Sequence, residues 1–318
     1  MMRFLAGAAR VAVIVAMAGV IGVLIGIAGK SIHWSFDLMG QFLLPATVVA
    51  AAAAIVAALF RWWRIAGGAA VLTAVAFAVA MPWSMQPASV PKEANRFRVL
   101  LFNVYWLNGR LADVREMIER ENADIVVLVE TTERVSNAMQ SLSSIYPYKL
   151  DCLGSGGCDI LIFSRSRLTP IDVAGDIGHT SLVATETEIA GCRLTLVATH
   201  MTRPFPKRPF SAQRTQAEEI AADVAAHGGV KLVLGDFNAA PWGYVIQTIA
   251  QHSQMNVLTG AGGTWPSVFP PQLRIPIDNM IASPALSFVS RRVLPKLGSD
   301  HLPVLGEIAV TDPTQCRN

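Results

Sequence analysis

The sequence predicts an α/β fold, in which a two-layer β-sandwich is flanked by helices and preceded by three transmembrane helices. Two observations carry this prediction. Of the 318 residues, 52% are hydrophobic and only 15% are charged, and the apolar excess lies almost entirely before Pro91. Beyond that point, strand patterns alternate with amphipathic helices and hairpins, a mixture typical of layered α/β domains.

Three uncharged apolar segments precede the linker, and each is about as long as a helix that crosses a bilayer. They cover residues 11–29, 38–60 and 65–83 approximately. A cleaved signal peptide is the rival interpretation of the first segment, because Ala28 and Gly29 form a small-residue site. That segment is longer than a usual signal, however, and two similar segments follow it. We therefore expect a transmembrane region over residues 1–84 and a proline-rich linker over residues 85–96.

The arginine distribution predicts how these spans are oriented. Arg3, Arg10, Arg61 and Arg64 fall on one side of a three-span arrangement, and cytoplasmic loops keep the positive charge. The amino terminus is then inside, and an odd number of spans places the rest of the chain outside. We expect a multi-pass protein of the inner (cytoplasmic) membrane with a periplasmic or extracellular domain.

The net charge of +3 does not indicate nucleic-acid binding once it is divided along the chain. Residues 1–90 contain five basic residues and one acidic residue, and the remainder contains 21 basic and 22 acidic residues. The domain beyond the membrane region is therefore close to neutral. It lacks the basic footprint expected of a nonspecific DNA-binding domain.

The four cysteines fit an exported domain, in which disulfides are stable. Cys152 and Cys158 bracket the flexible segment LGSGG, and we expect them to be bonded. Zinc is disfavoured because a single C-x5-C pair is not a usual ligand spacing. Cys192 and Cys316 pair only if the carboxyl-terminal tail folds back, which the sequence leaves open.

The domain after the linker is expected to span residues 97–312. Its elements follow from apolar periodicity and from strand-forming composition. Strands are expected at 97–103, 124–130, 159–165, 181–189, 192–200 and 231–238, with shorter ones near 277–282, 286–293 and 301–310. Helices are expected at 111–121, near 133–142 and at 211–227.

Several of these strands end in a residue able to hold a metal or a phosphate. Such polar groups lie at the edge of an apolar core, where each needs a partner. In layered α/β folds, the carboxyl ends of strands are also where ligand-binding groups collect. The residues are Asn103, Glu130, His200, Asp236 and Asn238 at strand ends, Asp278 within PIDNMIA, and Asp300 with His301 before the last strand.

The motifs LLFNV, VLVET, ATH, GDFNAAPW, PIDNMI and GSDHLPV occur in this order over nearly the whole of residues 97–310. Together they resemble the endonuclease/exonuclease/phosphatase superfamily, which has the deoxyribonuclease I-like fold. The resemblance implies a Mg²⁺-dependent hydrolase of phosphate esters, with Mn²⁺ as an alternative metal. The implied activity is that of a phosphodiesterase, nuclease or phosphatase, acting on a nucleic acid, a lipid or a sugar phosphate.

The resemblance also implies a metal site and a catalytic carboxylate. Glu130 would be the principal ligand, with Asn103 and Asp300 nearby, since carboxylate and amide oxygens suit a hard cation. Asp236 would orient or deprotonate the attacking water. Asn238 would hold a phosphate oxygen.

Two histidines complete the implied site. His301 would pair with Asp278 and act either as the general base or as a cation that stabilises the phosphate. His200 matches the second histidine of the deoxyribonuclease-like branch, which has an acidic partner of its own. Near residues 159–165 the only acid is Asp159, which is slightly displaced from the position expected in that branch.

Other interpretations stay open from the sequence. Asp278 is alternatively a turn residue, and His200 alternatively a hydrogen-bonded core histidine. The basic segment from Thr202 to Arg214 either grips an anionic group or is simply solvated. As a whole, the chain is alternatively a noncatalytic membrane-anchored binding module. The complete set of site residues argues against that alternative, and the sequence does not predict an oligomeric state.

Overall fold

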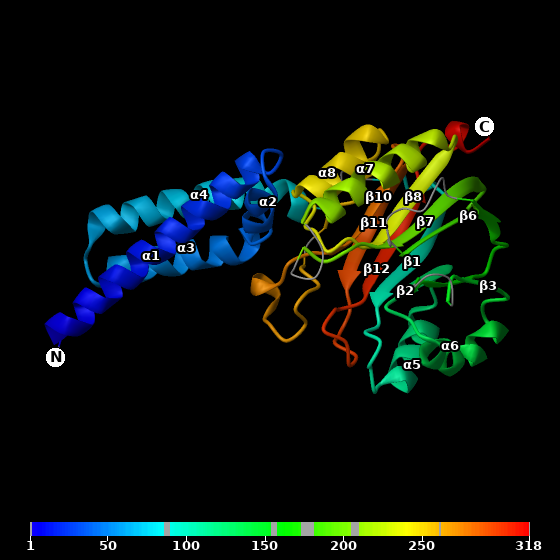
Figure 1. Ribbon diagram of the computed structural model, residues 1–318, viewed down its shortest axis with the longest axis horizontal. Coiled ribbons are helices and arrows are strands. Elements are labelled where there is room, and N and C mark those ends of the chain that lie inside the picture. Colours follow the sequence, from blue (N-terminus) through cyan, green and yellow to red (C-terminus); the bar gives the residue numbers. More distant parts are fainter. Residues whose placement is uncertain are drawn as a thin grey trace.

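The computed structural model describes residues 2–85, 90–153, 158–172, 181–204, 210–260 and 262–317. Figure 1 shows a bundle of long helices joined end-on to a β-sandwich that has helices on its two outer faces. The sandwich confirms the predicted fold class. Residues 86–89 of the expected linker lie outside the described residues.

The helical bundle contains α1 (Met2–Gly29), α2 (Trp34–Gly40), α3 (Leu43–Leu59) and α4 (Trp63–Ser84). By length and composition α1 and α4 are each apolar enough to cross a membrane. The single helix expected over 38–60 is instead a pair, α2 and α3, bent by 58°. The bundle therefore supplies two candidate spans, or three if the bent pair counts as one.

The turn that contains Arg61 lies at the end of the bundle away from the sandwich, whereas Lys30 lies beside the sandwich. Figure 1 shows the amino terminus and the α3–α4 turn, which contains Arg61, at the end of the bundle far from the sandwich. The segment between α1 and α2 lies at the opposite end, next to the sandwich. This arrangement agrees with the separation of the arginines from the segment between α1 and α2 in the sequence.

Two six-stranded sheets form the sandwich. The first has the order β11-β12-β1-β2-β4-β3, and the second has the order β5-β6-β7-β8-β10-β9. In the first, the bounds are β1 Arg96–Asn103, β2 Ile125–Val129, β3 Tyr148–Asp151, β4 Leu161–Ser164, β11 Leu286–Val293 and β12 Val304–Val310. In the second, they are β5 Thr169–Ile171, β6 Ser181–Ile189, β7 Cys192–His200, β8 Val230–Asp236, β9 Asn256–Val257 and β10 Asp278–Ala282.

The central strands are buried on both faces, which explains their uninterrupted apolar runs. One set of side chains, including Val99, Val127, Leu196 and Leu234, fills the space between the sheets. The alternate set packs against outer helices, as Leu100 and Val126 do beneath α5 (Leu111–Glu121). A parallel pair joins neighbouring strands in each sheet, β1 with β2 and β7 with β8, so their carboxyl ends point the same way.

Helices cover the two outer faces of the sandwich (Figure 1). On the first sheet, α5 is followed by α6 (Glu133–Ala138) and the 3₁₀ turn η1 (Gln140–Ser144), where one helix was expected. On the second sheet lie α7 (Phe210–Ala226) and α8 (Tyr244–His252). The sequence prediction missed α8 and the short strands β3, β5 and β9. Two further 3₁₀ turns are η2 (Pro271–Leu273) and η3 (Pro313–Arg317).

The helical bundle is hydrogen-bonded to the loop that follows β8. The Asp37 carboxylate accepts from the Tyr244 amide at 2.8 Å, and the Gly40 carbonyl accepts from the Trp242 indole at 2.7 Å. Lys30 Nζ donates to the Trp242 carbonyl at 2.6 Å. Because α8 has no side-chain cap of its own, Asp37 supplies the acceptor at its amino terminus. The helical bundle and the sandwich thus contact each other through polar groups as well as through apolar side chains.

Both cysteine pairs form disulfides. The predicted Cys152–Cys158 bond is confirmed, with the two Cα atoms 5.5 Å apart. The tail does fold back: η3 places Cys316 beside Cys192 at the start of β7, with a Cα–Cα distance of 4.6 Å. This second bond ties the carboxyl-terminal tail to the second sheet.

The two disulfides should differ in their effect on stability. Cys192–Cys316 joins residues separated by 124 positions, and Cys152–Cys158 joins residues separated by 6. On the chain-entropy model the longer loop contributes about 5 kcal/mol and the shorter about 2.4 kcal/mol. Replacing both members of the first pair with alanine should lower the free energy of unfolding more than the same change in the second pair. Guanidinium unfolding of the full-length protein in detergent measures the free energy of unfolding of each variant. Equal decreases in the two variants would show that loop length does not determine the stabilisation.

Candidate active site

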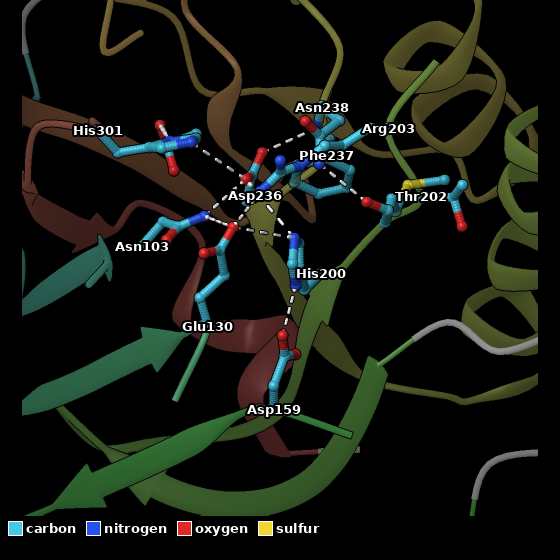
Figure 2. Close-up of polar contacts among 12 residues, drawn as sticks. Asn103, Glu130, Asp159, His200, Thr202, Arg203, Asp236, Phe237, Asn238 and His301 are labelled. Atoms are coloured by element: carbon cyan, nitrogen blue, oxygen red, sulfur yellow. Dashed lines mark hydrogen bonds and ion pairs between the residues drawn. The ribbon is translucent and has the colours of Figure 1, made fainter. Parts of the chain in front are cut away.

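The candidate site is formed where strand ends from both sheets meet. Asn103 ends β1 and Glu130 follows β2 in the first sheet, whereas His200 ends β7 and Asp236 ends β8 in the second. In the second sheet, Asp236 pairs in register with His200 on one side and with Asp278 on the other. Figure 2 shows the Asn103, Glu130, His200 and His301 side chains directed toward Asp236.

A glycine lets β7 and β8 approach closely at this edge. A Cβ atom on Gly235 would lie 1.8 Å from the Thr199 carbonyl oxygen. Only glycine therefore fits immediately before Asp236. The close approach brings His200 and Asp236, the next residue of each strand, into one cluster.

Asp236 is the centre of the cluster and is fully buried. Its Oδ1 accepts from the Asn238 amide at 2.9 Å, and its Oδ2 accepts from Asn103 Nδ2 at 2.9 Å. Asn103 Nδ2 also donates to Glu130 Oε1 at 3.1 Å, so one amide group joins two carboxylates. A buried carboxylate without such donors would destabilise the folded state.

Glu130 combines a strained backbone with a carboxylate oxygen that has no partner in the described part of the chain. Its φ of 54° lies in the left-handed region, which is uncommon for a side chain other than glycine. Its Oε1 accepts from Arg203 Nη2 at 2.6 Å. Its Oε2 is buried and has no hydrogen-bond partner among the described residues. A buried carboxylate oxygen that accepts no hydrogen bond is available to coordinate a cation.

Two histidine–aspartate pairs flank Asp236. His200 Nδ1 lies 2.8 Å from Asp159 Oδ2, and His301 Nδ1 lies 2.9 Å from Asp278 Oδ2. Each aspartate holds one ring nitrogen, which directs Nε2 toward Asp236 Oδ2 at 3.8 Å for His200 and 3.6 Å for His301. A carboxylate partner of this kind fixes the orientation of the imidazole.

These surroundings shift the pKa values of the buried groups. Burial lowers the pKa of His301, but the charges of Asp278 and Asp236 and the bond to Asp278 outweigh it and raise that pKa to about 10. Burial likewise opposes the rise at His200, where the bond to Asp159 and the charges of Asp236, Asp159 and Glu130 bring the pKa to about 9. Burial raises the pKa of Asp236, against the lowering influence of both histidines.

The pairing of Asp159 with His200 supplies the acidic partner that the sequence placed slightly out of position. Asp159 precedes β4 and follows Cys158, so the short disulfide holds the segment that carries it. The Thr131 amide and hydroxyl both donate to the Asp159 carbonyl, at 2.9 and 2.8 Å. Thr131 follows Glu130 directly and therefore links the two acids of the site.

The remaining predicted residues lie at the border of the cluster. Asn238 is partly buried, has a φ of 49°, and donates from Nδ2 to the Met201 carbonyl at 2.9 Å. Asp300 Oδ2 accepts from the Trp265 indole at 3.2 Å, and its Oδ1 has no partner among the described residues. Lys207 and Arg208 of the basic segment lie outside the described residues.

The sequence prediction missed two supporting side chains. Ser299 Oγ donates to the Asn103 carbonyl at 2.7 Å and accepts from the His301 amide at 3.0 Å. Ser299 lies in GSDHLPV, directly before the predicted residues Asp300 and His301, so the motif could have identified it as a site residue. Trp265 contacts Asp300 from a distant loop, and no local pattern indicates that contact.

The donor set fits a divalent cation. Ligand atoms of Glu130, His200 and Asp236 lie within 4.8 Å of one another, and so do those of Asp236, Asp278 and His301. With the orphaned Glu130 Oε2, the first group offers oxygen ligands to a hard cation. Asn103 Nδ2 faces the carboxylates, and its Oδ1 accepts from the Tyr105 amide at 3.1 Å. Asp300 belongs to neither group of ligand atoms.

Comparison with known proteins identifies the class. Residues 100–301 match the family model described as the endonuclease/exonuclease/phosphatase family. The chain therefore belongs to this family, and the motif resemblance is confirmed. No curated protein matches the chain.

Solved structures share the fold. An endonuclease/exonuclease/phosphatase from Bacteroides vulgatus is 18% identical, with a TM-score of 0.55, and covers 68% of this chain and 99% of its own. TDP2 from D. rerio, complexed with a single-strand DNA product, is 13% identical, with a TM-score of 0.55 and coverage of 67% and 98%. A beta toxin variant from Staphylococcus aureus with bound magnesium ions is 17% identical, with a TM-score of 0.53 and coverage of 66% and 98%.

Family and site together indicate a hydrolase that acts on phosphate esters. Members of the family typically depend on divalent metals, and acidic and histidine groups able to bind one lie together here. The structural similarity to these solved structures establishes the fold. Their sequence identities are too low to define the substrate.

Proposed function

We propose that this protein is a membrane-anchored, Mg²⁺-dependent hydrolase of phosphate esters, with Mn²⁺ as an alternative metal. The observation that carries the proposal is the buried Asp236 cluster. In it, Glu130 Oε2 has no hydrogen-bond partner among the described residues, and two histidines are aligned by aspartates. A noncatalytic binding module would not need this combination of unpaired and oriented groups. The combination matches the requirements of metal-assisted hydrolysis.

A divalent cation bound at Glu130 would offset the charge that develops on the phosphate in the transition state. Asp236 would take the proton of the attacking water as its oxygen bonds to phosphorus. Asn238 and Arg203 would hold phosphate oxygens at the edge of the site.

His301 would face the phosphate through Nε2, because Asp278 holds Nδ1. It would either transfer a proton or stabilise the phosphate charge, and in the acid role it would protonate the leaving oxygen as the P–O bond breaks. His200 would act in the same way from the opposite side of Asp236, held by Asp159.

We further propose the division of the chain into a transmembrane region over residues 1–84, a linker over 85–96 and a catalytic domain over 97–312. The domain would lie on the periplasmic or extracellular side of the inner membrane. The arginines at the far end of the bundle and the two disulfides in the domain support this placement.

The topology has a direct test. A reporter that is active only in the periplasm, fused after Asn318, should be active, because an amino terminus inside and three spans put the domain outside. A reporter active only in the cytoplasm should be silent at the same position. Activity of the cytoplasmic reporter alone would show that the orientation is reversed.

The metal site is tested by comparing two variants. Glu130→Gln keeps the side-chain shape but removes the charge that offsets a cation, so activity should fall and be partly rescued by high Mg²⁺. His301→Ala should lower the rate by about 10² to 10⁴ without rescue, since it removes proton transfer or charge stabilisation. The measurement is a Mg²⁺ titration of hydrolysis by each variant and the parent.

Glu133→Gln is the matched control, because Glu133 is an exposed glutamate three positions from Glu130. It should titrate like the parent. If Glu130→Gln also keeps the parental rate and Mg²⁺ dependence, Glu130 is not the ligand and the metal assignment is wrong.

A further inference from the structure

An apolar cavity lies between the helical bundle and the candidate active site. Its volume is about 400 Å³, within the range of small-molecule sites, which is roughly 300–1,000 Å³. The bent helix pair contributes Leu38 and Phe42 to its wall. The loop before β10 contributes Trp265, Ile275 and Ile277.

The lining residues on the catalytic side are bonded to the acids of the site. Arg203 Nη2 contacts Glu130 Oε1 at 2.6 Å, and the Asn238 amide contacts Asp236 Oδ1 at 2.9 Å. The Trp265 indole N–H donates to Asp300 Oδ2 at 3.2 Å, and the same side chain lines the cavity. The cavity therefore lies beside the candidate site, and Arg203 and Asn238 belong to both.

Contacts between the bundle and the sandwich fix the opposite wall in place. The Ala240 amide donates to Gln41 Oε1, and the Tyr244 amide donates to Asp37 Oδ1 at 2.8 Å. A Cβ atom added to Gly243 would lie 2.8 Å from Gln41 Nε2, so the Gly243 backbone packs closely against the Gln41 side chain. Leu38 and Phe42, which flank these anchors, are held against the site.

We propose that the cavity binds the hydrocarbon part of a lipid phosphate ester, whose phosphate lies beside Arg203 and Asn238. This assignment of substrate class rests on the proposed hydrolytic function. The cavity has a cationic and polar end at the reaction centre and an apolar end formed by a candidate membrane helix. That polarity matches an amphiphile that enters from a bilayer with its phosphate leading.

The wall chemistry favours a hydrocarbon chain over a nucleobase. Of the polar side chains in the described wall, Arg203 and Asn238 lie at the phosphate end. Gln41 is engaged with Ala240 and with Asp37. A nucleobase in this space would leave polar edges without partners, which is costly in a buried site.

The test uses ethyl, butyl, hexyl and octyl phosphate with the full-length protein in amphipol, so that no phospholipid competes for the cavity. Affinity should rise about two- to fourfold per added methylene, following the transfer of hydrocarbon from water. Leu38→Trp fills the cavity and should abolish this dependence on chain length. Leu59→Trp is the matched control, because Leu59 is 77% exposed at the far end of α3, and it should keep the dependence after the same correction for partition into the amphipol.

Binding is measured with the Glu130→Gln variant as background, so that turnover does not consume the ligand. Hydrolysis of each ester by the parent is measured separately with Mg²⁺. A failure to hydrolyse any ester counts against the proposed function, and the binding series still decides the inference. Equal affinity for ethyl and octyl phosphate, equal behaviour of the two tryptophan variants, or tighter binding of a dinucleotide than of octyl phosphate would overturn the lipid assignment.

Discussion

The structure depends on the burial of one carboxylate, Asp236, at the end of β8. An isolated buried charge is costly, so folding must bring donors and cations to it. Asn103 comes from the first sheet, His200 from the neighbouring strand, and His301 from the segment before β12. The two sheets can satisfy Asp236 only if their strand ends meet there. The same concentration of carboxylates supplies the groups that would hold the proposed cation.

Sequence reasoning succeeded where the signal was local. The helix Leu111–Glu121 and the hairpin through Ala190 and Gly191 occur where periodicity and turn chemistry predict them. The strand-end polar residues could be found because buried apolar runs end at them. The motifs and their order along the chain also carried the resemblance to the family, which the family model confirms.

Most of the missed features depend on contacts between distant residues. The break between α2 and α3 is the exception, because Gly40 ends α2 and Pro45 disfavours a helix that continues through residue 41. The bond from Gln41 to Ala240 lies at this break. Cys316 finds Cys192 only because the tail returns to β7. Asp159 reaches His200 because Thr131 and a disulfide position its segment, although it is displaced along the sequence from the expected place. Arg203 was recognised as basic, but its contact with Glu130 is tertiary.

Anomalous scattering from crystals of the full-length protein grown with Mn²⁺ would show whether the Asp236 cluster holds a catalytic divalent cation. An anomalous peak is expected at the carboxylate of Glu130, among the ligand atoms shared with His200 and Asp236. Absence of a peak there at saturating Mn²⁺, with the Glu130–Arg203 contact retained, would show that the cluster does not bind the cation.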